Sequence, residues 1–346
     1  MKVIEYAAGL FIVALGVIVL VVAKALLVPL AIAIALTFLI NTLADYIDHL
    51  RLGGLRIPRR LSITLASVVI IALLALFIDI IVRTFQNMMP SIQEYQLQLQ
   101  GLTHETAYRL GLDEYVDVGT LFQDIDLKPF AANLGAGISA FAGHFVLIVI
   151  YVIFLLLEQR DFQQKFDQLF SDPQRFEQAR EALRRISESV KTYISVKTFT
   201  SFLTAILSFT ALRIIGVEYA VFWSFLIFLF NFIPNLGSML ATALTVLYAL
   251  IQFDSFGPVL TTLIAIAAIQ LIVGNYIDPR LMGRRLNISP LVVLFSLVLW
   301  GSIWGVIGMF LSVPMMVILM IILAQFPGTR KIAMFMSQNG RIGKLR

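Results

Sequence analysis

The stretch "NFIPNLGSML", residues 231–240, interrupts a long apolar segment of the chain. It places Asn231, Pro234, Asn235 and Gly237 within seven positions. Proline removes a backbone donor and clashes with the preceding helical turn, and glycine favours bends. An amide side chain is also costly to bury in apolar surroundings unless it finds a hydrogen-bond partner. We therefore predict that a helix breaks here and that the chain turns at these residues.

The composition of the whole chain indicates what surrounds this break. Of the 346 residues, 59% are hydrophobic and 14% are charged, and the mean hydropathy is +0.90. A soluble domain has about 45–50% apolar and about 25% charged residues, so a water-soluble core cannot hold this excess. The long apolar runs occupy 7–23, 25–44, 61–82, 137–157, 199–212, 219–230, 236–251, 258–274 and 288–323. They predict an all-α, polytopic integral membrane protein with about eight spans.

A second break lies in the apolar block 288–323, at "WGSIWGVIG", residues 300–308. When it is aligned with the break in block 218–252, Gly308 falls opposite Gly237. The arms beside each break have about 12 to 18 residues, which is short for an apolar core about 30 Å thick. Paired short segments of this kind predict two broken or re-entrant hairpins that form an inverted repeat. Two short complete spans in each block are the alternative.

The distribution of charge predicts the orientation in the membrane. Basic residues cluster at 51–60, at 158–197, at 280–285 and in the C-terminal tail, whereas acids predominate in 85–135. The positive-inside rule then places both termini in the cytoplasm and 85–135 outside, in a multi-pass protein of the cell inner membrane. Lys2 is followed by an apolar run without a small-residue cleavage site, which predicts an uncleaved first span. The basic excess thus indicates orientation and not nucleic-acid binding.

These patterns divide the chain into five expected regions. They are an N-terminal scaffold of three spans (1–84), an extracytoplasmic helical segment (85–136), a fourth span with a cytoplasmic amphipathic helix (137–197), a transport core with both broken hairpins (198–325) and a basic cytoplasmic tail (326–346). Asp172 and Pro173 are suited to begin the amphipathic helix. Gly135, Ser139 and Gly143 form a small-residue face that favours close helix packing in membranes.

The tips of the two breaks are the first candidates for a binding site. Unpaired backbone groups at a break are tolerated in a membrane only where protein or a water-filled cavity covers them. Asn231, Asn235 and Ser238 at the first break can either cap those groups or bind a polar ligand. The same two alternatives hold for Trp300, Ser302 and Trp304 at the second break.

A second polar segment, "GNYIDPRLMGRRLNISPL", follows the span 258–276. In it we expect Pro279 to end the helix, Gly283 to allow a tight turn and Pro290 to begin the next helix. Asn275 is a further substrate-binding or gating candidate. Asp278 lies near Arg280, Arg284 and Arg285, which favours a structural ion pair with them over ion binding.

Few ionisable groups lie within the apolar runs. Asp79 and Arg83 are four residues apart on one helix face, which favours an interfacial pair over an ion-coupling gate. No carboxylate lies centrally in 198–325, which weighs against cation coupling. The chain has no cysteine, and His49, His104 and His144 are scattered without a metal-binding motif, so we expect no metal, no cofactor and no enzymatic activity.

Three stretches carry a resemblance to a known family: "LFNFIPNLGSML", "GNYIDPRLMGRRLNISPLVVLFSLVLWG" and "WGVIGMFLSVP". In them the chain resembles the autoinducer-2 exporter family of bacterial and archaeal membrane proteins, over nearly its full length. The matching positions are Asn231, Pro234, Asn235, Gly237, Asn275, Pro279, Gly283, Pro290, Trp300, Gly301, Gly305, Gly308 and Pro314. Phe232 and Ser302 depart from the residues frequent at their positions, which leaves the substrate open.

The resemblance implies a multi-span exporter or permease that assembles as a homo-oligomer, in particular a pentamer. The family includes exporters of the quorum signal autoinducer-2 and proteins proposed to be sodium–proton antiporters. We expect a lipid-embedded transporter that exports a small polar organic molecule, with autoinducer-2 as the leading substrate, by an elevator-like movement of 198–325. A sodium–proton antiporter is the alternative, and a non-transporting oligomeric scaffold is the alternative of another class.

Overall fold

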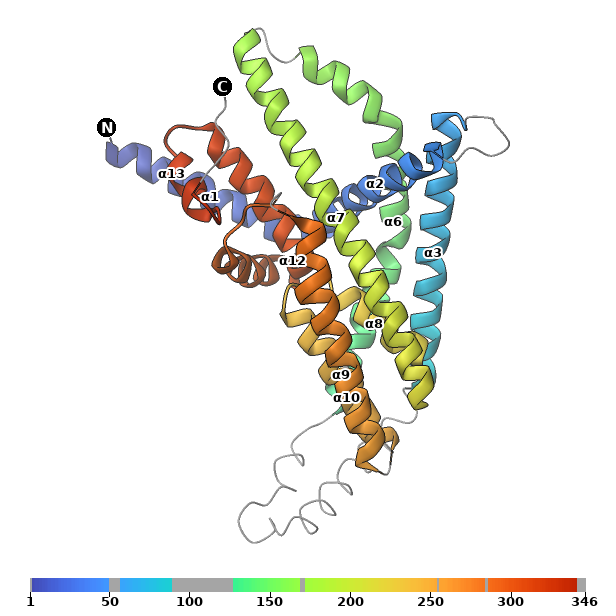
Figure 1. Ribbon diagram of the computed structural model, residues 1–346. Coiled ribbons are helices and arrows are strands. Elements are labelled where there is room, and N and C mark those ends of the chain that lie inside the picture. The colour runs from blue at the N-terminus through green and yellow to red at the C-terminus, as the bar shows by residue number, and fades with distance from the viewer. Residues whose placement is uncertain are drawn as a thin grey trace. The chain divides into compact units, whose positions relative to one another are not determined.

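The computed structural model describes residues 2–49, 57–88, 127–168, 172–253, 255–283 and 286–340 (Figure 1). Helices make up nearly all of its regular structure in these ranges. They are α1 (Lys2–Val22), α2 (Lys24–His49), α3 (Arg59–Met88), α6 (Leu127–Gln168), α7 (Pro173–Ile215), α8 (Ala220–Phe230), α9 (Leu236–Gln252), α10 (Phe256–Ile272), the π-helix η2 (Val273–Ile277), α11 (Asp278–Met282), α12 (Pro290–Gln325) and α13 (Arg330–Met336). The all-α class predicted from the sequence is confirmed.

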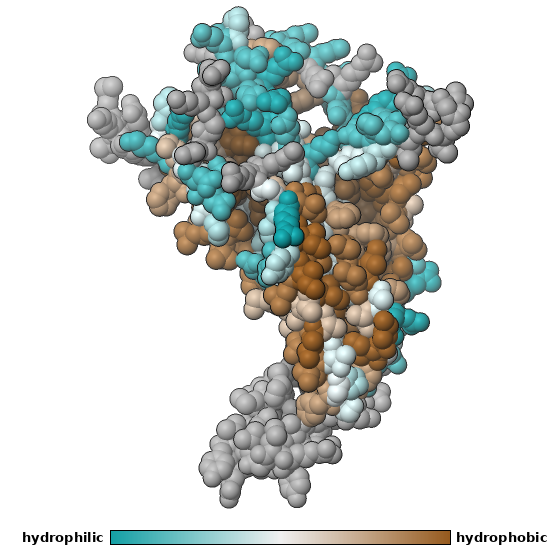
Figure 2. Space-filling model, in the orientation of Figure 1, coloured by the Kyte–Doolittle hydropathy of each residue, from teal (hydrophilic) through white to brown (hydrophobic). Residues whose placement is uncertain are grey.

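Six stretches of the described helices are long and apolar enough to cross a membrane. They are Lys24–His49, Arg59–Asn87, Gly135–Gln159, Phe176–Ile215, Phe256–Met282 and Pro290–Gln325, and α8 and α9 are shorter apolar helices. Large apolar side chains remain exposed on them, as at Val68, Phe154 and Ile264, where 59%, 63% and 60% of the residue is exposed. Apolar residues accordingly cover much of the visible helix surface (Figure 2), as lipid-facing helices require.

Contacts between Cα atoms divide the chain into two compact units. The first unit comprises Met1–Ile70, Val146–Thr198 and Asp278–Arg346, and the second comprises Ile71–Phe145 and Phe199–Ile277. Each unit contains one of the two predicted breaks. Most of the expected outer segment, 89–126, lies outside the described residues.

In the second unit the first break forms a helical hairpin, hereafter the first hairpin, of α8, a turn at 231–235 and α9. Its open end is closed by Gln252, whose Oε1 accepts from Glu218 N (2.8 Å) and whose Nε2 donates to Gly216 O (2.8 Å). The rings of Trp223 and Tyr248 lie 5.0 Å apart near the same end. The chain therefore leaves the hairpin where it entered, and α8, at 11 residues, is too short for a full span.

In the first unit the second break bends α12 into two arms, hereafter the second hairpin. Gly305, with φ 65° and ψ −143°, is the non-helical residue at the bend. The residues before and after the hairpin pair as an isolated antiparallel bridge, Ile288 with Ser337. Ser289 N donates to Met336 O (2.9 Å), and Gln338 N donates to Asn287 O (3.1 Å). Both hairpins are thus held together at their open ends, which favours the re-entrant alternative.

Two local predictions are also confirmed. The amphipathic helix runs without interruption into the following apolar segment as α7. Asp172 accepts from Gln174 N through Oδ1 (2.9 Å) and so caps the helix that begins at Pro173. On the small-residue face of α6, a Cβ at Gly135 would lie 2.6 Å from Phe85 on α3, whereas a Cβ at Gly143 would meet nothing within 4 Å, so close packing of this face is seen at Gly135 and not at Gly143.

Candidate functional site

The tip of the first hairpin is a tight turn between α8 and α9. Asn231 is the C-cap residue directly after α8, and Pro234 lies within the turn. Asn235 has φ 59° and ψ −54°, and Leu236 N donates to Pro234 O across it (2.6 Å). This hydrogen bond between residues two apart defines a γ-turn with positive φ, which is rare and strained for a residue other than glycine.

The two asparagines at this tip have different surroundings. Asn231 is 7% exposed, and its Nδ2 donates to Ser201 Oγ on α7 (3.2 Å). Asn235 is exposed and makes no capping hydrogen bond with its side chain, and Ser238 Oγ donates to the Asn235 carbonyl (2.9 Å). Asn231 is therefore part of the protein interior, whereas Asn235 presents its amide at the surface of the turn.

Gly237 sets how closely α9 approaches the end of α8. A Cβ at this position would lie 1.7 Å from Phe230 O and 3.0 Å from Ile233 Cβ. No side chain can occupy that space unless the backbone moves. The glycine therefore permits the turn itself, as its place in the sequence motif suggested.

The second hairpin has the same constraint at its tip. A Cβ at Gly308 would lie 1.9 Å from Trp300 O and 3.0 Å from Trp304 Cβ. In each hairpin the glycine thus lies against a backbone carbonyl of the first arm, that of Phe230 or of Trp300. It also lies against the Cβ of the residue four positions before the glycine, Ile233 or Trp304. The alignment of Gly237 with Gly308, made from sequence alone, corresponds to this shared geometry.

The tryptophans at the second tip are buried within the first unit. Both residues are 8% exposed, and their rings lie 5.6 Å apart. Trp304 Nε1 donates to Leu20 O on α1 (3.0 Å), whereas Trp300 Nε1 has no hydrogen-bond partner among the described residues. Ser302 is exposed and bonds the Val298 carbonyl of its own helix (2.5 Å). Trp304 ties the tip of the second hairpin to the end of α1.

In the second polar segment the structure corrects the prediction for Pro279. The helix does not end there: α10 continues through the π-helix η2 and through α11 to Met282. A π-turn is wider than an α-turn, and its position directly before Pro279 relieves the clash that proline makes with the preceding turn. Gly283, with φ 59°, lies in a turn directly after this helix, as its predicted role in a tight turn requires, and Pro290 begins α12. Asn275 lies in η2 and is exposed.

Asp278 forms an ion pair with Lys197 of α7, a partner that the sequence did not suggest. Lys197 Nζ lies 2.6 Å from Asp278 Oδ2, and the two side chains are only 9% and 14% exposed. Tertiary packing brings α7 to the start of α11, whereas Arg284 and Arg285 lie outside the described residues, so the predicted pairing with the arginines stays a prediction. Asp79 and Arg83 form the predicted pair at 2.7 Å, and both are well exposed.

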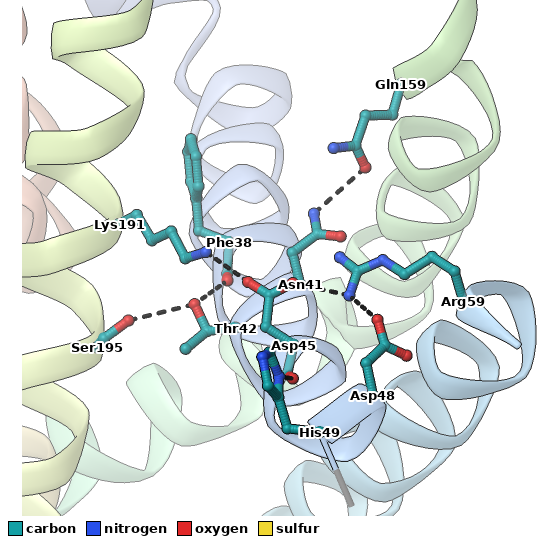
Figure 3. Close-up of polar contacts among 10 residues, drawn as sticks. All are labelled: Phe38, Asn41, Thr42, Asp45, Asp48, His49, Arg59, Gln159, Lys191 and Ser195. Atoms are coloured by element: carbon teal, nitrogen blue, oxygen red, sulfur yellow. Dashed lines mark hydrogen bonds and ion pairs between the residues drawn. The ribbon is translucent and has the colours of Figure 1, made fainter. Parts of the chain in front are cut away.

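A polar network in the first unit fixes α7 to α2 and α3. Figure 3 shows Asp45 between Lys191 of α7 (2.6 Å) and Arg59 of α3 (2.7 Å), with Arg59 also paired to Asp48 (2.7 Å). Thr42 and Ser195 hydroxyls lie 3.3 Å apart beside it. None of these residues belongs to the hairpin tips, and their ion pairs stabilise the packing of the three helices.

Sequence reasoning missed the polar character of the buried face of α7 in the second unit. Ser201, Thr204 and Ser208 are each 0% exposed and recur at spacings of three and four residues, and Leu212 continues the same face. The signal was present in "KTFTSFLTAILSFT", where hydroxyl residues recur with helical periodicity in an apolar run. The buried polar side chains of the second unit, among the residues described, are all uncharged: Thr200, Ser201, Thr204, Ser208, Ser224, Asn231, Thr245 and Thr262.

Long apolar helices, two hairpins broken at glycine and uncharged polar groups inside the fold together define a polytopic membrane transporter. Residues 10–328 match the family described as "AI-2E family transporter". The chain is 31% identical to the "AI-2 transport protein TqsA" of Escherichia coli strain K12 over 320 residues, which cover 91% of this chain and 90% of that protein.

Two further relatives are similar over comparable lengths. A "Putative transport protein" of Haemophilus influenzae is 32% identical over 80% of this chain and 82% of its own length. Another of that name, from Borreliella burgdorferi, is 30% identical over 91% of this chain and 85% of its own length. The chain belongs to the AI-2E transporter family.

Proposed function

We propose that this membrane transporter exports a small, uncharged polar organic molecule, with autoinducer-2 as the leading candidate. The observation that carries the proposal is the chemistry of the second unit. Its described buried polar residues carry hydroxyls and one amide, on α7, on the first hairpin and at Thr262 of α10, and the indole of Trp223, the residue before Ser224 on α8, is also buried. Such groups bind hydroxyl and carbonyl oxygens of a solute without needing a counter-charge. The name of the Escherichia coli relative supplies the specific candidate.

The same chemistry disfavours the sodium–proton antiporter. Within 198–325 the acids are Glu218, Asp254 and Asp278. Asp278 is already paired with Lys197, and Asp254 lies outside the described residues. Glu218 lies at the exposed open end of the first hairpin, next to Gln252. A proton-coupled site requires a carboxylate that can change its charge near the solute, and none of the described ones is so placed.

The proposed mechanism is alternating access in which 198–325 moves relative to the scaffold 1–84. In each hairpin, hydrogen bonds join the two ends of the chain opposite the tip, and the tip contains a glycine. Each hairpin can therefore move as one rigid unit. In this proposal Asn231 and Asn235 bind the solute at the first tip, and Trp300, Ser302 and Trp304 bound the path at the second. Assembly as a homo-oligomer, in particular a pentamer, and cytoplasmic termini complete the proposal.

Flux through reconstituted vesicles tests this function. We expect wild-type protein in liposomes to carry labelled autoinducer-2, and Asn235→Gly to reduce the flux at least 5-fold, because glycine keeps the turn but removes the exposed amide. Ser67→Ala is the matched control, since the Ser67 hydroxyl is satisfied by the Ile63 carbonyl of its own helix (2.8 Å). If wild-type vesicles carry no autoinducer-2 but their internal pH changes when sodium is added, the result would support antiport. Vesicles with neither activity would support the non-transporting scaffold.

A further inference from the structure

Two buried serines and one indole in the second unit have polar atoms that nothing in the described structure satisfies. Ser208 Oγ on α7, and Ser224 Oγ and Trp223 Nε1 on α8, have no hydrogen-bond partner among the described residues. The three residues are 0%, 5% and 7% exposed, respectively. Other hydroxyls nearby bond a carbonyl of their own helix, as Thr204 does with Thr200 O (2.8 Å). Leaving a buried donor unpaired is costly, so these three groups call for a physical explanation.

The register of α7 and α8 places the two serines at one level. The helices are joined by only four residues, 216–219, and therefore run antiparallel. The Ser201–Asn231 hydrogen bond fixes their register. Ser208 lies seven residues beyond Ser201, and Ser224 lies seven residues before Asn231. At about 1.5 Å per residue both serines are about 10 Å from that bond, in the same direction.

Both serines also lie on the faces that α7 and α8 turn toward each other. On α7, Ser201 and Ser208 share the single buried face of the helix in this unit. On α8, the Phe225 ring stacks on Phe77 of α3 (4.7 Å) and the Trp223 ring contacts Tyr248 of α9 (5.0 Å). Ser224 lies about 100° around the helix from each of these neighbours and seven residues from Asn231, so it shares the α7-facing side.

From this arrangement we infer that Ser208 and Ser224, with Trp223 next to Ser224 on α8, form a solute-binding site between α7 and the first hairpin, about 10 Å from its tip. The inference rests on the proposed transport function and adds a second position for its solute, deeper along the hairpin than Asn231 and Asn235 at the tip. Two hydroxyls can each donate and accept, and the indole N–H donates only. The ligand that fits is an uncharged molecule with at least two oxygen atoms, one of them a carbonyl or ether acceptor for the indole.

Flux and stability measurements on serine variants test the site. Ser208→Ala and Ser224→Ala should each raise the KM for labelled autoinducer-2 about 5- to 10-fold in liposomes, and the double variant about 30-fold or more. The thermal midpoint should not fall in either variant, since the hydroxyls have no partner to lose. Ser67→Ala should leave KM within about 2-fold of wild type.

Tryptophan fluorescence gives a second readout that does not depend on transport. The chain has three tryptophans, so the difference in emission between the protein and its Trp223→Phe variant isolates the signal of Trp223. Autoinducer-2 should change this difference, and introducing Ser208→Ala and Ser224→Ala should remove that change.

The possible outcomes separate this inference from the proposed function. If the wild type carries autoinducer-2 but the serine variants have unchanged KM, the proposed site is wrong and the proposed function stands. The same conclusion follows if the serine changes do not alter the fluorescence response of Trp223. Absence of wild-type flux would overturn the proposed function, and the inference with it.

Discussion

Gly237 and Gly308 act through one steric limit, which operates at the scale of single atoms. A methyl group at either position would overlap a backbone carbonyl, at 1.7 Å from Phe230 O and 1.9 Å from Trp300 O. A flexible side chain could move aside, but a backbone carbonyl at the end of a helix cannot do so without opening the turn. The requirement for glycine is therefore geometric at both tips and does not depend on the solute.

The first prediction concerns these two glycines. Gly237→Ala and Gly308→Ala should each lower the free energy of unfolding by about 1–3 kcal/mol or prevent assembly, as overpacking does elsewhere. Gly257→Ala in α10 is the matched control, because a Cβ at Gly257 would have no heavy atom within 4 Å. Thermal unfolding in detergent measures all three variants. If the tip variants unfold like the Gly257 control, the close approach at the tips is wrong.

The second prediction concerns the γ-turn at Asn235. Glycine adopts positive φ without strain, so Asn235→Gly should preserve the unfolding temperature. Asn235→Leu should destabilise by about 1–3 kcal/mol, because leucine in this backbone conformation is strained. The same unfolding assay measures both variants. Equal stability of the two would contradict the turn geometry.

At the scale of elements, the buried ion pair between Lys197 and Asp278 joins α7 to α11. Removing one partner leaves the other charge buried without this counter-charge, which is more costly than removing both. This pair is therefore the most specific constraint on the packing of these two helices.

The third prediction is a double-mutant cycle on this pair. Lys197→Met and Asp278→Leu should each destabilise by about 3–5 kcal/mol, and the double variant should recover much of that loss. Asp79→Asn provides the comparison: its exposed pair with Arg83 should contribute little to stability, so this variant should unfold close to the wild type. Chemical unfolding in detergent measures the cycle. Additive losses at 197 and 278 would show that the two side chains do not interact.

Much of this level of organisation could be predicted from the sequence, because breaks and helix starts have local causes. Pro234 and Gly305 lie where helices break, Gly237 permits the close approach at the first tip, and Asp172 caps the helix that begins at the next residue. The partner of Asp278 could not be predicted, since it depends on which helix packs beside α11. Pro279 misled for a similar reason: the π-helix before it absorbs the clash that was expected to end the helix.

At the scale of the whole molecule, the orientation predicted from the distribution of charge can be tested because the chain has no cysteine. The fourth prediction is that Ser91→Cys reacts with an impermeant thiol reagent from outside the cell, and Ser187→Cys only from the cytoplasmic side. Ser187 is exposed on α7, whereas Ser91 lies outside the described residues. Intact cells and inverted vesicles distinguish the two sides. Labelling of both positions from one side would contradict the assigned topology.

The central claim is that an uncharged polar interior carries an uncharged solute, and flux under a controlled membrane potential tests it most directly. Moving one net charge against about 100 mV would change the equilibrium distribution of a solute about 50-fold. We predict that liposomes with this protein carry labelled autoinducer-2 to the same final distribution at zero potential and at about 100 mV, with no change in internal pH. A distribution that follows the potential, or a sodium-dependent pH change without autoinducer-2 flux, would contradict the account.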